Sequence, residues 1–230
     1  MIREADATRA LLVQSPAMRT SIVLMAAATC LSPAPALAQT CLGRASFADA
    51  PWQLRLESSF SSDAKTFGPS LSLGSRNVFG GVLGDITGYS TIDQTALSIG
   101  GTIGIDGALD EQSHLHVCPI ATLIHRFGPN VPTADFSSTV AAFGGRVGVV
   151  AAENQTLQVI PTIGVEAQVE DDTVKVGADT TSETRTFAVV RFGVGFVLNR
   201  RTAIVPEIID LYGVASNTTF RVSATFQFGK

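Results

Sequence analysis

The chain of 230 residues is poor in charge and has a single tryptophan. Charged residues make up 16% of it, whereas roughly 25% is typical of soluble domains. Beyond the N-terminal region there is no run of about 20 apolar residues, which excludes a bundle of membrane-spanning helices. Lys and Arg are scattered, so the chain lacks the basic stripe that captures nucleic-acid phosphates.

Glycine and phenylalanine are abundant instead, with 21 and 13 residues. Polar and apolar side chains alternate along segments of about ten residues, a pattern typical of strands with two different faces. The C-terminal segment is the clearest case, because its polar face is made of Arg, Ser, Thr and Gln. Its apolar face holds Phe220, Val222, Ala224, Phe226 and Phe228.

The alternation predicts ten strands, with eight as the alternative count. The predicted ranges are 51–61, 66–74, 78–89, 94–105, 113–126, 136–150, 155–169, 184–198, 202–210 and 219–228. Short connections alternate with longer, more polar ones, including an acidic stretch at 170–183 that is expected to be a solvated loop. This pattern favours a closed antiparallel up-and-down transmembrane β-barrel, with a soluble β-sandwich as the rival fold.

The N-terminal region has the features of a cleavable export signal that starts at Met18. A charged start precedes an apolar core at 22–31, and Ala36 and Ala38 form a small-residue cleavage box. A helical anchor and a lipoprotein are the alternatives, but the core is short and prolines follow it. We therefore expect cleavage after Ala38, a periplasmic segment at 39–50 and a barrel at 51–230.

These features together resemble the small outer-membrane β-barrel proteins of bacteria, over about residues 50–230. The resemblance implies a place in the outer membrane with both termini in the periplasm. It also implies contact with membrane lipids and lipopolysaccharide, and assembly by the barrel-assembly machinery. One departure is that Gly229 and Lys230 follow Phe228, whereas the family's last strand usually ends in an aromatic residue.

Aromatic residues cluster near the ends of the predicted strands, where a barrel carries girdles at the two membrane interfaces. The expected girdle residues are Trp52, Phe60, Phe67, Tyr89, Phe127, Phe136, Tyr212, Phe220, Phe226 and Phe228.

Six charged residues share the parity of the polar face and are expected to point into the lumen. Since isolated charges in a narrow interior are costly, we expect a salt-bridge network in preference to a charge-lined pore. Closure of the barrel would bring Arg221 beside Glu57. The predicted members are Arg55, Glu57, Glu166, Arg191, Glu207 and Arg221.

Two cysteines, Cys41 and Cys118, remain after removal of the signal peptide. The periplasm is oxidising, so we expect a disulfide between them, with two free thiols as the alternative. Such a bridge would tie the segment 40–50 across the base of the barrel as a partial plug.

The histidines form no clear metal-binding or catalytic motif in the sequence. His114 and His116 share a face without a third ligand, so no metal site and no cofactor are expected. His125 has Ser137 and Ser138 across a loop, but the spacing fixes no acid partner. We expect a non-catalytic barrel with a structural role or an extracellular ligand bound through its loops. The alternatives are a narrow channel for small or apolar solutes and a lipid-modifying hydrolase.

Overall fold

The computed structural model describes residues 40–47, 50–75, 77–90, 94–109, 115–129, 131–213 and 217–229. The signal peptide predicted for 1–38 and its cleavage site after Ala38 lie outside the described residues. Within these ranges, no helix is long and apolar enough to span a bilayer.

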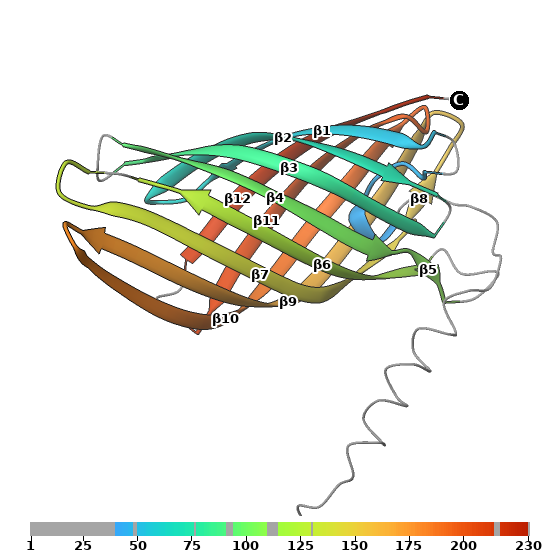
Figure 1. The fold of residues 1–230 in the computed structure, drawn as a ribbon. Coiled ribbons are helices and arrows are strands. Elements are labelled where there is room, and N and C mark those ends of the chain that lie inside the picture. The colour runs from blue at the N-terminus through green and yellow to red at the C-terminus, as the bar shows by residue number, and fades with distance from the viewer. Residues whose placement is uncertain are drawn as a thin grey trace, which may run out of the picture. The chain divides into compact units, whose positions relative to one another are not determined.

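Ten long strands form a closed antiparallel barrel (Figure 1). Each pairs with the long strands before and after it, and the first closes on the last, with Trp52 opposite Phe228 and Phe60 opposite Phe220. The ten-strand prediction is therefore confirmed. The strands are β1 Trp52–Phe60, β2 Ala64–Gly74, β3 Val78–Tyr89, β4 Thr95–Ile105, β6 Leu115–Phe127, β7 Asp135–Val149, β9 Leu157–Val176, β10 Asp179–Leu198, β11 Thr202–Tyr212 and β12 Asn217–Phe228.

Three short elements complete the described chain. A 3-10 helix, η2, covers Thr40–Leu42. The two-residue strands β5 (Gly107–Ala108) and β8 (Ala152–Glu153) pair with β6 and β9 at one end of the barrel. Figure 1 shows this end on the right, together with the C-terminus.

The two faces of the wall follow the alternation seen in the sequence. Large apolar side chains point outward, and small or polar ones point inward. In β12, for example, Phe226 is 43% exposed and its neighbour Gln227 only 7%. A closed barrel of this kind pairs its strand backbones internally and turns an apolar surface to its surroundings.

The acidic stretch 170–183, expected to be a loop, is instead a β-hairpin. β9 continues to Val176 and β10 begins at Asp179, with Gly177 at φ +60° in the turn. Arg185 forms ion pairs with Asp172 and Glu170 on the neighbouring strand. Pairing of opposite charges across the strands thus stabilises a segment whose charge density had predicted a loop.

The segment 40–47 lies inside the barrel, in the part drawn blue at the right of Figure 1. Thr40, Cys41 and Leu42 are buried, and a disulfide joins Cys41 to Cys118 on β6. The periplasmic segment predicted at 39–50 is thus in part an internal plug. We call residues 40–47 the plug segment.

Inward-facing glycines make room for the plug segment. A Cβ at Gly148 on β7 would overlap the backbone carbonyl of Thr40, and one at Gly195 on β10 would overlap the backbone of Gly43. Gly43 itself has φ +66°, a conformation that side-chain-bearing residues rarely adopt. Close backbone approach therefore requires glycine at these positions.

Two glutamines opposite each other on β1 and β12 hold the plug segment from the other side. Gln53 Nε2 donates to the Ala45 carbonyl at 2.8 Å, and Gln227 Nε2 donates to the Ser46 carbonyl at 2.7 Å. These bonds satisfy backbone carbonyls of a buried segment.

We predict that Gly148→Ala destabilises the barrel by about 1–3 kcal/mol, because the new methyl group forces the Thr40 backbone to shift. Gly145→Ala on the same strand is the matched control, since its Cβ would meet only the Cys118 carbonyl oxygen at 3.8 Å. The measurement is urea unfolding followed by circular dichroism. Equal midpoints for the two variants would contradict the close packing of the plug segment.

Candidate functional site

The interior of the barrel holds three layers along its axis. The plug segment fills one end, a ring of buried charges crosses the middle, and a small polar chamber opens toward the other end. We call the middle layer the charged belt. It comprises Arg44, Arg55, Glu57, Arg146, Glu166, Arg191, Glu207 and Arg221.

Glu207 on β11 is the least exposed carboxylate of the belt, at 4%. Its Oε1 accepts from Arg146 Nη1 at 3.0 Å, and its Oε2 accepts from Arg221 Nε at 2.8 Å. Arg221 is the direct cross-strand partner of Glu207, whereas Arg146 reaches it from β7. Because β9 and β10 lie between β7 and β11 in the ring, this bond spans the lumen.

Glu166 on β9 forms the second junction. Arg191 donates to both of its carboxylate oxygens, from Nε at 2.9 Å and from Nη2 at 3.0 Å. Arg146 Nη2 adds a third bond at 3.3 Å. A paired-donor arrangement of this kind fixes the guanidinium plane as well as its position.

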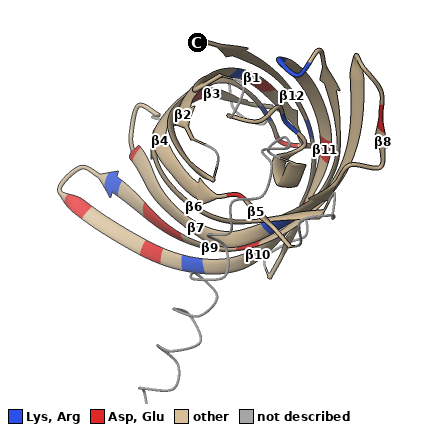
Figure 2. Cartoon of the chain, turned by 90° about the vertical axis from the view of Figure 1, so that its right-hand side faces the viewer, with Lys and Arg blue, Asp and Glu red and all other residues tan. Residues whose placement is uncertain are grey.

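The belt continues to β1 through Glu57. Its Oε2 lies 3.2 Å from Arg55 Nη1 and 3.8 Å from Arg221 Nη1. Arg55 Nε also donates to the Ser70 hydroxyl at 3.0 Å. The ion pairs therefore run without a break from β1 through β12 and β11 to β7, β9 and β10. Figure 2 gives the view along the barrel, with charged residues coloured on the strands.

The structure brings the six charged residues predicted for the lumen into one network, but the sequence reading missed two members. Arg146 follows two glycines in a segment that alternates poorly, although it shares the parity of Ser138 and Ala142. Arg44 precedes the first strand, so strand periodicity gave no signal for it.

A chamber of about 360 Å³ lies at the end of the lumen away from the plug segment. Glu170 stands in its wall, accepts from the Ser138 hydroxyl at 3.0 Å and lies 3.7 Å from Arg126 Nη1. Tyr89 and Phe136 line the same chamber and have the parity of inward-facing residues. Their assignment to the aromatic girdle is thus corrected, because position near a strand end does not determine the face.

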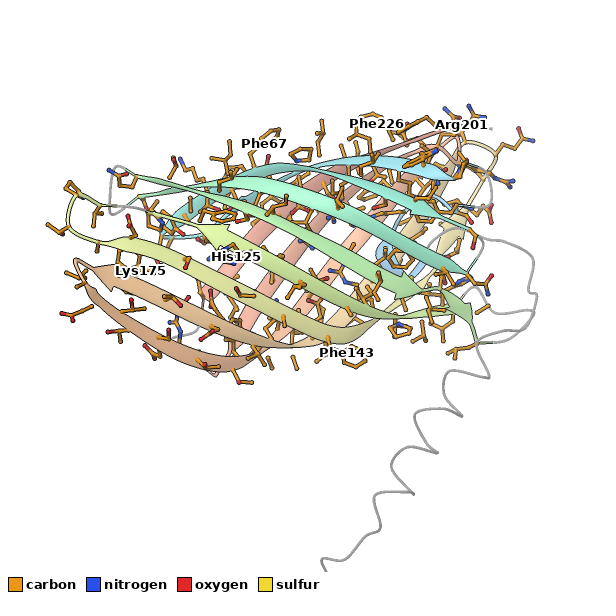
Figure 3. All side chains as sticks on the ribbon, in the orientation of Figure 1. Phe67, His125, Phe143, Lys175, Arg201 and Phe226 are labelled. Carbon is orange, nitrogen blue, oxygen red and sulfur yellow. A yellow bond between two sulfur atoms is a disulfide. The ribbon has the colours of Figure 1, made fainter. Side chains whose placement is uncertain are left out.

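The other girdle residues point outward and are exposed. Phe67 and Phe226 are labelled on the wall in Figure 3. The outward set comprises Trp52, Phe60, Phe67, Phe127, Tyr212, Phe220, Phe226 and Phe228.

His125 lies on the outer wall and has no serine partner in the described ranges. Its Nδ1 is 2.9 Å from the Thr139 hydroxyl, and its ring contacts Phe127 edge-on. Ser138 faces the lumen and bonds to Glu170, and Ser137 lies opposite Phe127. The His–Ser arrangement considered for a hydrolase is therefore not formed by these residues.

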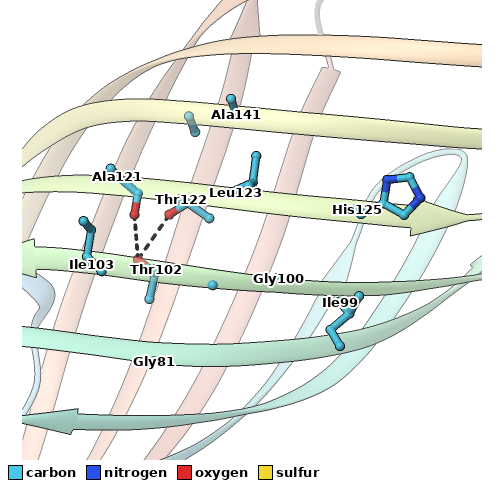
Figure 4. A pocket seen from close by; sticks show the side chains of 12 residues that line it. Gly81, Ile99, Gly100, Thr102, Ile103, Ala121, Thr122, Leu123, His125 and Ala141 are labelled. Carbon is cyan, nitrogen blue, oxygen red and sulfur yellow. Dashed lines mark hydrogen bonds between the residues drawn. The ribbon is translucent and has the colours of Figure 1, made fainter.

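A shallow apolar hollow of about 590 Å³ adjoins His125 on the outer wall (Figure 4). Small residues at Gly101, Ala121 and Ala141 lie between the larger Ile99 and Leu123. The Thr102 hydroxyl donates to the Ala121 carbonyl at 3.3 Å, so this backbone carbonyl already has a side-chain partner within the wall. The hollow thus suits the side of a hydrocarbon chain better than a polar ligand.

His116 and Asp106 form a buried pair beside the disulfide, with His116 Nδ1 2.8 Å from Asp106 Oδ1. Burial raises the pKa of the Asp106 carboxyl, and the hydrogen bond from His116 opposes this shift. Asp106 also lies near Cys41 and Cys118, but both sulfur atoms are used by the disulfide. His114, the other member of the predicted histidine pair, lies outside the described residues.

The sequence matches no protein-family model and no curated protein. The chain is similar to a number of solved structures, among them the following barrels. Neisserial surface protein A is 12% identical, with a TM-score of 0.41, over 78% of this chain and 98% of its own. The outer membrane protease OmpT from Escherichia coli is 8% identical, with a TM-score of 0.42, over 78% of this chain and 94% of its own. Ail, the attachment invasion locus protein of Yersinia pestis, is 12% identical, with a TM-score of 0.36, over 78% of this chain and 99% of its own.

We predict that Glu207→Gln costs about 3 kcal/mol of folding free energy, because Arg146 and Arg221 lose the charge of their shared partner in a buried site. Glu57→Gln should cost less, about 1 kcal/mol, since the Glu57 side chain is 24% exposed. Urea unfolding measures both changes.

The control is Asp210→Asn on the same strand as Glu207, where the side chain faces outward and accepts from Thr218. Its effect should stay below about 0.5 kcal/mol. A Glu207→Gln protein as stable as wild type would show that the belt does not hold the barrel together.

Proposed function

We propose that this chain is an integral outer-membrane β-barrel with a closed lumen, anchored in the bacterial envelope and presenting one end to the exterior. Its role is structural and binding rather than catalytic. The observation that carries the proposal is the combination of an apolar outer wall with an interior filled by the plug segment and the charged belt.

The outer wall has the extent that a membrane requires. On β9 every outward residue from Leu157 to Val169 is apolar. That stretch measures about 40 Å along the strand and about 30 Å at a tilt of roughly 40°, comparable to a bilayer's hydrocarbon core. Beyond it Asp171 and Thr173 face outward, which supports placing the membrane boundary near Val169.

The orientation of the barrel in the membrane is assigned from the part of the β9–β10 hairpin that lies beyond the boundary near Val169. The plug segment and Gly229 lie at one end, and we assign this end to the periplasm. The opposite end carries the β9–β10 hairpin, which extends past β11 and β12 in Figure 1. We assign it to the exterior, next to lipopolysaccharide.

The hairpin supports a binding role. β11 pairs with β10 only from Ala188 onward, so the edge formed by residues 179–187 has no strand partner among the residues described. An unpaired edge can accept an extended polypeptide through backbone hydrogen bonds. Asp179 and Glu183 on this strand favour a partner that carries basic residues.

The closed lumen speaks against the channel alternative. The disulfide, Gln53 and Gln227 fix the plug segment, and Arg146 bonds across the lumen to Glu207. A solute would have to displace both layers, at the cost of several buried ion pairs.

We therefore expect the purified protein to give no discrete conductance steps in planar bilayers. Resistance to urea extraction from lipid vesicles verifies that the protein has inserted. Reproducible unitary currents from the wild-type protein would overturn the closed-lumen proposal in favour of a narrow channel.

A further inference from the structure

The charged belt contains more positive than negative groups. Its cations are the guanidinium groups of Arg44, Arg55, Arg146, Arg191 and Arg221, and its anions are the carboxylates of Glu57, Glu166 and Glu207. Of the neighbouring acids, Glu170 pairs with Arg126 and Arg185, whereas Asp85 faces the lumen from β3 and accepts from Thr87. The five guanidinium groups thus outnumber the three carboxylates of the belt and Asp85 together, which leaves an excess of positive charge in a confined interior.

Arg44 is the cation that the belt leaves uncompensated. It forms no ion pair or hydrogen bond with any described residue, and its Nε is buried without a partner. The carboxylates whose charges act on it are Glu207 and Glu57, and both already have partners. Glu207 accepts from Arg146 and Arg221, and Glu57 pairs with Arg55 and Arg221. Burial, followed by repulsion from Arg55 and Arg146, lowers the pKa of the Arg44 guanidinium.

A second donor points to the same place. Arg146 uses both of its terminal nitrogens on Glu207 and Glu166, but its Nε is buried and has no hydrogen-bond partner. Arg44 and Arg146 are close enough for their charges to repel each other. An oxyanion accepts several N–H bonds at once, so two neighbouring guanidinium groups with spare donors suit it in charge and in donor type.

We propose that the belt binds a small oxyanion, of the size and charge of phosphate or sulfate, at Arg44 and Arg146. The anion offsets the excess positive charge and completes the link between the plug segment and the barrel wall. This site is internal, so it is independent of the surface-binding role.

The test is thermal unfolding of the purified full-length protein in detergent, in chloride, sulfate and phosphate buffers of equal ionic strength. We expect a saturable rise of about 3–10 °C with sulfate or phosphate over chloride. Sulfate also stabilises proteins without binding, so the variants below separate the two effects.

Arg44→Gln should abolish the saturable rise while unfolding at the same or a higher temperature than wild type in chloride. Glu57→Gln, which increases the positive excess, should lower the anion concentration needed for half of the rise by about tenfold. Lys175→Gln on the external hairpin is the control and should behave as wild type.

Wild-type midpoints that do not differ between anions would overturn the proposal, as would a saturable rise that persists in Arg44→Gln. If Arg44→Gln does not fold, the decision rests on Glu57→Gln. An unchanged half-saturation concentration in that variant rejects a site within the belt.

Discussion

The pairing of β1 with β12 is the constraint on which the rest of the structure depends. It removes the two free edges that an open ten-stranded sheet would expose, and an open edge cannot persist in hydrocarbon. The same register sets Gln53 opposite Gln227, whose side chains hold the plug segment. It also brings Glu57 within reach of Arg221, so closure completes the charged belt.

The width of the barrel determines how its interior is packed. A narrow ring of strands encloses a space too wide for one layer of side chains to fill with apolar groups alone. Here the end near Cys118 is filled by a returning piece of the chain, and the middle is filled by arginines long enough to reach across, such as Arg146. The two solutions meet at Arg44, which belongs to the plug segment but extends into the belt.

Period-two alternation was sufficient to predict the strands and the six lumen charges, because in a barrel the parity of a residue fixes its face. Parity failed where local signals competed with it. The charges at 170–172 suggested a loop, although Arg185 pairs with Glu170 and Asp172 across the hairpin. Position near a strand end suggested the girdle for Tyr89 and Phe136, which line the chamber. Arg44 lies on no strand, and only the folded chain brings it to the belt.

The proposed barrel spans the outer membrane with the β9–β10 hairpin outside. Two single-cysteine additions test it, Ser182→Cys on the hairpin and Thr156→Cys in the turn at the other end, both exposed positions. Intact cells are treated with a membrane-impermeant maleimide. We expect labelling at 182 in intact cells and at 156 only after lysis. Labelling of both positions only after lysis, or labelling of 156 in intact cells, would contradict it.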